Sequence, residues 1–88
     1  MKNIDEITTE VLNWVYEKFP LAKNNKISDN DSLLESGIVD SLGILDIVAF
    51  LEETFSIQLS DEDMVADHFE TVRSIASFTH IKISGSNM

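Results

Sequence analysis

Apolar residues near the start of the chain recur at the spacing of an amphipathic helix. Positions i, i+3, i+7 and i+11 share one helical face. The stripe consists of Ile4, Ile7, Val11 and Val15, widened by Leu12 and Phe19. Pro20 ends this predicted helix, because proline lacks the N–H that the helical ladder needs and disfavours helix in the residue before it.

A long loop is predicted over residues 21–40, where Asn, Asp, Ser and Gly are interleaved with apolar residues at no sustained period. The apolar residues that would anchor this loop to the core are Ile27, Leu33, Leu34 and Ile38. Loops of this length are unusual in small domains and tend to be functional. The length of the loop therefore favours a functional role for it over a purely structural helical bundle.

A second helix is predicted from about Ser41 to Phe55, with Ser41 at or near its N-cap. Asp40 is favourable beside the positive end of the helix dipole. The stripe that would face the core consists of Ile44, Ile47, Val48, Leu51 and Phe55. This stripe is sufficient to dock the helix.

The same helix carries a second apolar row, turned about a third of a turn from the first. The row consists of Leu42, Leu45 and Ala49. It lies among the acids Asp46, Glu52 and Glu53, which argue against full burial. A helix with two apolar faces is either deeply buried or uses one face for a partner, so the acids favour a partner.

Two further helices are predicted in the last third of the chain. Ser60 and the acids of residues 61–63 open a short helix that runs to about Phe69, and Thr71 caps the next. The apolar face of that last helix consists of Val72, Ile75, Ala76 and Thr79, flanked by Phe78. The predicted fold is all-α: a small four-helix bundle with three longer helices and a short third one. It would form one domain over residues 1–83, followed by a disordered tail over 84–88.

The composition of the 88 residues supports one modest core and adds two restrictions. There is no cysteine, so disulfides and thiolate metal sites are ruled out and any thiol would have to be imported on a cofactor. No stretch approaches the roughly 18 to 20 apolar residues that span a bilayer. We therefore expect a monomeric cytoplasmic protein.

Charge is unevenly distributed along the chain, whose formal net charge is −10. Residues 27–72 contain twelve Asp or Glu and no Lys or Arg. Such a field repels nucleic acid and anionic membranes and attracts basic protein surfaces. A basic protein partner is therefore expected, and a nucleic acid is not.

Familiar catalytic and metal-binding patterns do not fit this chain. No motif ties His68 or His80 to a serine, and no nucleophile elbow is present. Residues 29–35 begin like a calcium loop, but Leu33 and Leu34 occupy positions that need an oxygen ligand and a glycine. By elimination we expect no catalytic residue, no metal site and no enzyme.

The segment "GIVDSL", residues 37–42, resembles the acyl carrier protein family, including stand-alone peptidyl and aminoacyl carriers. The signature of that family is Asp-Ser-Leu at the start of the second helix. The similarity extends through "LLESGIVDSLGILDIVAFLEETF" to "FETVRSIASF", and so covers most of the chain. The resemblance implies that residues 1–83 form a carrier domain.

The resemblance also implies that a phosphopantetheinyl transferase attaches 4'-phosphopantetheine from coenzyme A to Ser41. The thiol of this arm would carry an acyl or aminoacyl group as a thioester between enzymes of a fatty acid, polyketide or nonribosomal peptide type pathway. Basic patches on the transferase and on the loading ligases, synthases or transferases would bind a docking face. That face consists of Asp40, Leu42, Leu45, Asp46, Ala49, Glu52 and Glu53. The alternative is an unmodified acidic helical module that binds a basic protein.

Two departures bear on the type of carrier. Gly43 stands where many fatty-acid carriers have an acid, and Ala49 where they often have a larger apolar residue. Gly43 would weaken the acidic cluster beside the arm and permit closer approach by a partner. The segment "HFETV", residues 68–72, looks more like stand-alone carriers of specialised pathways, which we favour slightly over a primary fatty-acid carrier.

Overall fold

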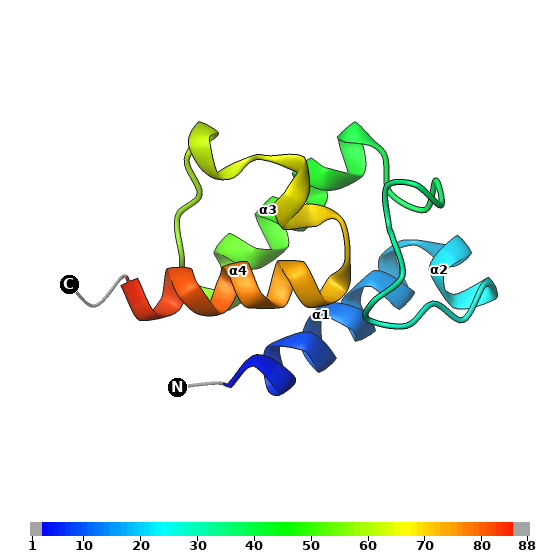
Figure 1. Cartoon of the computed structure of the whole chain (residues 1–88), viewed down its shortest axis with the longest axis horizontal. Helices are drawn as coiled ribbons and strands as arrows, with labels where there is room; N and C mark the ends of the chain where they lie inside the picture. Colours follow the sequence, from blue (N-terminus) through cyan, green and yellow to red (C-terminus); the bar gives the residue numbers. More distant parts are fainter. Residues whose placement is uncertain (1–2, 86–88) are drawn as a thin grey trace.

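The computed structural model describes residues 3–85, with only the backbone of Ser41, and all regular structure in that range is helical (Figure 1). The four α-helices are α1 (Ile4–Lys18), α2 (Pro20–Asn24), α3 (Ser41–Phe55) and α4 (Val72–Gly85). Two 3₁₀ turns, η1 (Asp61–Asp63) and η2 (Ala66–Phe69), connect α3 to α4. The prediction of a small all-α bundle is confirmed.

The proline that ends α1 also begins the next helix. The last residue of α1 is Lys18, and Phe19 caps it in an extended conformation. Pro20 then opens α2 within the segment that was predicted to be a loop. Proline suits the first position of a helix because the N–H it lacks has no partner there anyway. The loop is therefore shorter than predicted and begins at Asn25.

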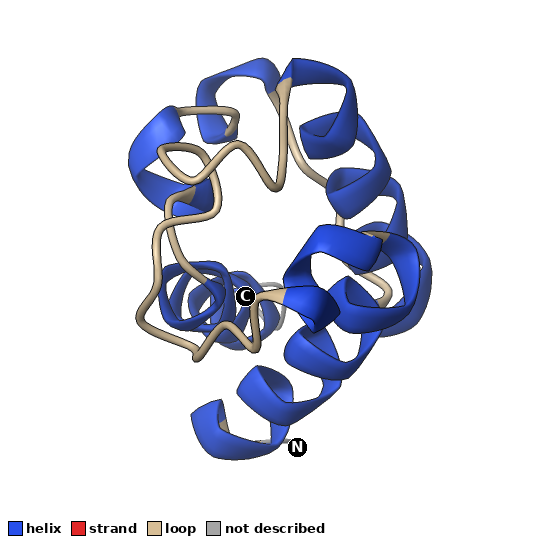
Figure 2. Ribbon diagram, turned by 90° about the vertical axis from the view of Figure 1, so that its right-hand side faces the viewer, coloured by secondary structure: helices blue, strands red, loops and turns tan. Residues whose placement is uncertain are grey.

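The core lies where α1, α3 and α4 face one another, and Figure 2 shows the helices arranged around it. Among the helical residues, those with no exposed surface include Ile7, Val11, Val15, Ile47, Leu51, Val72, Ile75 and Ala76. These residues come from the predicted apolar stripes, so the 3.6-residue period identified the buried faces correctly. Burying such stripes supplies most of the helical stability, because short isolated helices are marginal in water.

Backbone and side-chain bonds fasten the long loop to the start of α4. Leu33 N–H donates to the carbonyl of Glu70 at 2.7 Å, and Arg73 N–H donates to the carbonyl of Asp29 at 2.8 Å. The Arg73 guanidinium also binds the Asp29 carboxylate, with Nη2 2.9 Å from Oδ2. Of the predicted anchors, Ile27, Leu33 and Ile38 are buried and Leu34 is partly buried. The loop is thus held at defined points before it enters α3.

The predicted third helix is wrong in form: it is two 3₁₀ turns rather than one helix. Val65 is extended between the turns (φ −102°, ψ 147°), which interrupts the helical ladder. The predicted cap is confirmed, because Ser60 N–H donates to Asp63 Oδ2 at 2.9 Å and the two residues form a capping box. Tight i to i+3 bonds, such as Asp63 N–H to the carbonyl of Ser60 at 3.0 Å, replace those of an α-helix.

Thr71 caps α4 as predicted. Ser74 N–H donates to Thr71 Oγ1 at 2.9 Å, and Thr71 N–H donates to Ser74 Oγ at 3.0 Å. The helix continues through Ser84 and Gly85, two residues that were predicted to belong to a disordered tail. The rest of that predicted tail, residues 86–88, lies outside the described residues.

Candidate functional site

The first turn of α3 is built on Asp40 rather than on Ser41. Asp40 is extended (φ −108°, ψ −171°), and its Oδ1 accepts a hydrogen bond from Gly43 N–H at 2.8 Å. Its carbonyl accepts from Ile44 N–H at 3.0 Å. Asp40 is therefore the N-cap, and Ser41 is the first residue of the helix. The prediction placed Ser41 at or near the cap; the short acid before it takes that role because its carboxylate reaches the third N–H.

The chain that leads into α3 is held in place, whereas the start of the helix is open. Val39 is 2% exposed, and its N–H donates to the carbonyl of Leu33 at 3.1 Å. Gly37 makes the preceding turn at φ +78°, a backbone conformation that glycine adopts without strain. In contrast, Asp40 is exposed and Leu42 is 73% exposed. The backbone of Ser41 thus lies between two exposed residues on a fixed support.

This arrangement fits a phosphodiester. The first N–H groups of a helix have no partner within the helix, and the dipole is positive at that end. The Gly43 N–H donates to the Asp40 carboxylate. The N–H groups of residues 41 and 42 can therefore bind solvent or phosphate oxygens. Residues 40–42 are therefore suited to carry a phosphate-linked group.

The second apolar row of α3 is exposed, as predicted. Leu42 is 73% exposed and Leu45 55%, and Ala49 is also exposed. Asp46 and Glu53 are exposed beside them. The structure therefore gathers three apolar side chains and two acids on one face of the helix that Ser41 begins.

Glu52 has a different environment from the other predicted docking acids. It is half-buried, and its Oε2 accepts a hydrogen bond from Leu59 N–H at 2.9 Å. This bond ties the last turn of α3 to the chain that follows it. The Glu52 carboxylate is thus engaged inside the domain.

Gly43 faces the interior of the domain rather than a partner. A Cβ at this position would lie 3.0 Å from Val39 Cγ1 and 3.1 Å from Phe19 Cε1. These distances are shorter than ordinary van der Waals contact, so the glycine allows Phe19 and Val39 to pack under the first turn of α3. The expectation that Gly43 permits closer approach by a partner is corrected: the close approach is made by the protein's own side chains.

An aromatic pair between α1 and α3 was not identified from the sequence. Trp14 and Phe50 stack with their ring centroids 4.5 Å apart and an interplanar angle of 14°. Both residues lie outside the predicted apolar stripes, yet both are partly buried against the core. The contact could have been suspected from the sequence, because a large aromatic residue flanks the apolar stripe of each helix. Such side chains bury a large area when they can reach a partner.

Other candidate chemistry in the described residues serves the fold. Lys82 Nζ lies 2.7 Å from Asp63 Oδ2, and hydrogen bonds from Lys82 and from Ser60 N–H lower the Asp63 pKa from 3.8 to about 2. In the calcium-like segment, Asp29 pairs with Arg73, and Asp31 Oδ2 accepts from a backbone N–H at 2.8 Å. Residues 3–85 contain no group of three His, Cys, Asp or Glu side chains placed to hold a metal ion. Within the same range no helix has the length and apolar character to cross a membrane.

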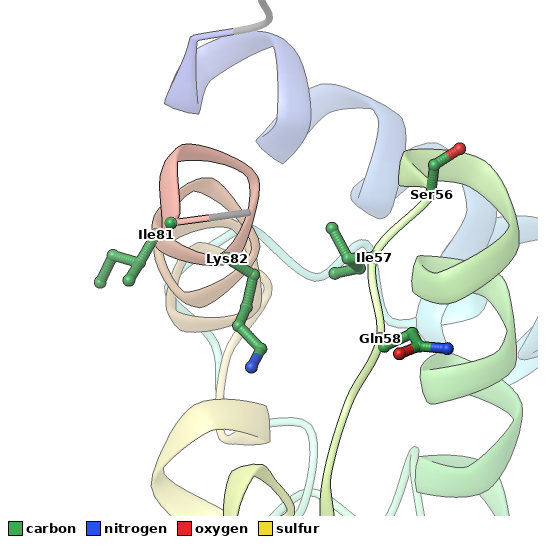
Figure 3. Close-up of a pocket in the computed structure, with 6 residues that line it drawn as sticks. Ser56, Ile57, Gln58, Ile81 and Lys82 are labelled. Atoms are coloured by element: carbon green, nitrogen blue, oxygen red, sulfur yellow. The ribbon is translucent and has the colours of Figure 1, made fainter. Parts of the chain in front are cut away.

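A surface depression of about 470 Å³ lies at the far end of α3 from Ser41 (Figure 3). Its lining residues are Ser56, Ile57, Gln58, Ile81, Lys82 and Gly85. Figure 3 shows Ile57 pointing from the chain after α3 toward α4. A 15-residue helix is about 22 Å long, so this depression is not part of the site at Ser41.

Known proteins are similar to this chain over most of its length. Residues 9–79 match the family described as "Phosphopantetheine attachment site". The acyl carrier protein of Buchnera aphidicola subsp. Schizaphis graminum is 33% identical over 81 residues, which are 92% of this chain and 90% of that protein. The acyl carrier protein of Buchnera aphidicola subsp. Acyrthosiphon pisum (strain Tuc7) is 33% identical over 82 residues, 93% of this chain and 95% of that protein. The chain therefore belongs to the acyl carrier protein family and contains its phosphopantetheine attachment domain.

Proposed function

We propose that Ser41 carries the 4'-phosphopantetheine group and that the protein shuttles an acyl or aminoacyl group between enzymes. The observation that carries this proposal is the position of Ser41 as the first residue of α3, directly after the Asp40 cap and between two exposed residues. The family match includes this position. As a shuttle it would work as a single carrier domain, a monomer in the cytoplasm.

The proposal assigns distinct roles to the arm and to the chain. The phosphopantetheine arm, when attached, supplies the thiol that a chain without cysteine lacks, and the cargo rides on it as a thioester. Asp40 fixes where the helix begins and so holds the Ser41 backbone in place. The free N–H groups of the first turn and the positive end of the dipole stabilise the phosphate charge. The chain is a substrate and scaffold, and partner enzymes perform the catalysis.

The exposed face of α3 is the proposed docking site for these partners. Leu42, Leu45 and Ala49 offer small apolar contacts beside Asp46 and Glu53. Acids would steer a basic enzyme surface toward the arm, and the apolar contacts would fix its register. Asp40 extends the acidic surface to the start of the helix, whereas Glu52 contributes less because its carboxylate binds the backbone of Leu59.

The packing under Gly43 supports a carrier of a specialised pathway over a primary fatty-acid carrier. No acid lies within the first turn of α3, and an acid at position 43 would meet Phe19 and Val39. After the Asp40 cap, the next acid of the docking face is therefore Asp46. Some carriers have an acid in the first turn of this helix, and their partners would place a basic residue there. A partner adapted to the present protein would place its basic residues farther along α3.

Intact-mass measurement tests the proposal directly. The protein is incubated with coenzyme A and a broad-specificity phosphopantetheinyl transferase, and we expect a mass increase of one phosphopantetheinyl group. Ser41→Ala should abolish the increase, while Ser60→Ala, which changes another serine at the start of a helical turn, should retain it. No mass increase in the wild-type protein would overturn the proposal and leave the acidic protein-interaction module in its place.

A further inference from the structure

A groove runs along the junction of α1 and α3, beside the docking face proposed above. One depression of about 260 Å³ and a second of about 310 Å³ share Trp14, Phe50 and Thr54 as lining residues. The remaining lining residues of the first are Lys18, Asp46, Ala49 and Glu53. The remaining lining residues of the second are Glu10, Asn13 and Glu17. We refer to the two depressions together as the α1–α3 groove.

Aromatic side chains form the floor of the α1–α3 groove. The stacked pair of Trp14 and Phe50 is supported by edge contacts from Phe19, 5.8 Å from Trp14, and from Phe55, 6.1 Å from Phe50. Trp14 and Phe50 are both partly exposed. The groove therefore presents an aromatic surface, which favours a ligand group that is itself flat and weakly hydrated.

Carboxylates predominate around this floor. Glu17, Asp46 and Glu53 are exposed on the rim, and the single ammonium among the lining residues is that of Lys18. Asp5, Asp29 and Asp63 have cationic partners, whereas Glu17, Asp46 and Glu53 form no ion pair within the described part of the chain. These three carboxylates outnumber the one lining ammonium and give the rim an excess of negative charge.

We propose that the α1–α3 groove receives an arginine side chain of a partner enzyme, an inference that rests on the proposed carrier function. An arginine fits both features of the groove, because its planar guanidinium packs on aromatic rings and pairs with carboxylates. Lysine fits less well, since its ammonium is strongly hydrated and has no flat surface. Asp46, Ala49 and Glu53 belong both to the groove and to the docking face on α3, so one partner surface would cover both.

Trp14 allows occupancy of the groove to be measured, because it is the only tryptophan in the chain. The probe is a helical peptide with one arginine placed one turn from a leucine, and its control contains citrulline, the neutral analogue of arginine. The full-length chain is titrated with each peptide while the indole N–H signal of Trp14 is followed by NMR. We expect the arginine peptide to shift this signal and the citrulline peptide to bind at least fivefold more weakly.

Two double variants make the test specific for the groove. Glu17→Gln with Glu53→Gln should weaken the arginine peptide at least threefold. Glu62→Gln with Glu70→Gln makes the same change in net charge with exposed acids that do not line the groove, and should leave the affinity within twofold. Equal binding of both peptides, or shifts confined to the amides of Leu42 and Leu45, would overturn the proposal. Ser41 modification is read separately by mass, so failure of the carrier function would not be mistaken for failure of the groove.

Discussion

Phe19, which caps the end of α1, lies directly beneath Gly43 in the first turn of α3, and a Cβ on Gly43 would be 3.1 Å from Phe19 Cε1. We therefore expect Gly43→Asp to destabilise the fold by about 1 to 3 kcal/mol, the usual cost of overpacking. Urea denaturation measures this change.

Gly85→Ala is the matched control for that substitution. Gly85 is also helical, but nothing lies within 4 Å of a Cβ built there. Its replacement should leave the free energy of unfolding unchanged or raise it by less than about 1 kcal/mol, since alanine is the better helix former. An equal loss of stability in both variants would contradict the packing under Gly43.

The stack of Trp14 on Phe50 joins α1 to α3. Phe50→Ala should lower the free energy of unfolding by about 2 kcal/mol, less than the roughly 3 to 5 kcal/mol of a fully buried phenylalanine because Phe50 is partly exposed. Phe50→Leu should recover part of the loss by restoring apolar contact without the ring. Urea denaturation followed by Trp14 fluorescence reports both variants, and an unchanged stability of Phe50→Ala would show that the stack does not hold the helices together.

Asp63 predicts a dependence of stability on acidity. Its pKa is lowered to about 2 in the folded protein, first by the hydrogen bond from Lys82, from an ordinary value of 3.8. Because the folded-state pKa is the lower one, the stabilisation is fully present well above pH 4 and is lost as the pH falls from about 4 through 2. The stability difference between the wild-type protein and Asp63→Asn should therefore shrink over this range. Lys82→Met removes the hydrogen bond that lowers the Asp63 pKa most, so it should weaken the pH dependence over the same range.

Salt should raise the melting temperature. The twelve acids of residues 27–72 include Asp29 and Asp63, which have cationic partners, and a larger number that form no ion pair with any residue the structure describes. Mutual repulsion of the unpaired acids opposes the compact state, and counterions or magnesium screen it. Scanning calorimetry at increasing NaCl concentration at neutral pH checks this expectation. A melting temperature that falls with salt would mean that the ion pairs of Arg73 and Lys82 outweigh the repulsion.

Substitutions on the exposed face of α3 should slow modification of Ser41 without unfolding the protein. Asp46 is exposed and Leu42 is 73% exposed, so neither side chain is needed for the core. We expect Asp46→Lys to reduce kcat/KM of the phosphopantetheinyl transferase about tenfold and Leu42→Ala less, because charge mainly affects the rate of encounter. Glu62→Lys, with the same charge change in η1, is the control. Unchanged modification rates in both test variants would contradict the docking face.

The parts of the fold that depend on interactions between residues close together in the sequence could be predicted. The stripe of Ile7, Val11 and Val15, the cap at Thr71 and the capping box at Ser60 all follow from local spacing and hydrogen bonding. Pro20 was predicted to end a helix but not to begin another, since both outcomes agree with its chemistry.

The candidate site was found because its signal is local as well. Periodicity and capping placed Ser41 at the start of a helix, and the neighbouring acids indicated that Leu42 and Leu45 are exposed. The role of Ser41 was implied by the resemblance of the surrounding segment to the acyl carrier protein family. Which residue caps α3 could not be decided, because serine and aspartate are both good caps and only the backbone conformation distinguishes Asp40 from Ser41.

By itself the sequence determined the helical class, the buried stripes and the acidic, cysteine-free surface around Ser41. Three contacts were decided only by the tertiary structure. Phe19 packs beneath Gly43, and the Glu52 carboxylate accepts a hydrogen bond from the backbone of Leu59. Trp14 stacks on Phe50, and the two rings form the floor of the α1–α3 groove. The physical reason is range: periodicity and capping act over one or two turns of a helix. The contacts above join residues of different helices, or join a helix to the chain that follows it. Which residues meet therefore depends on how the helices pack.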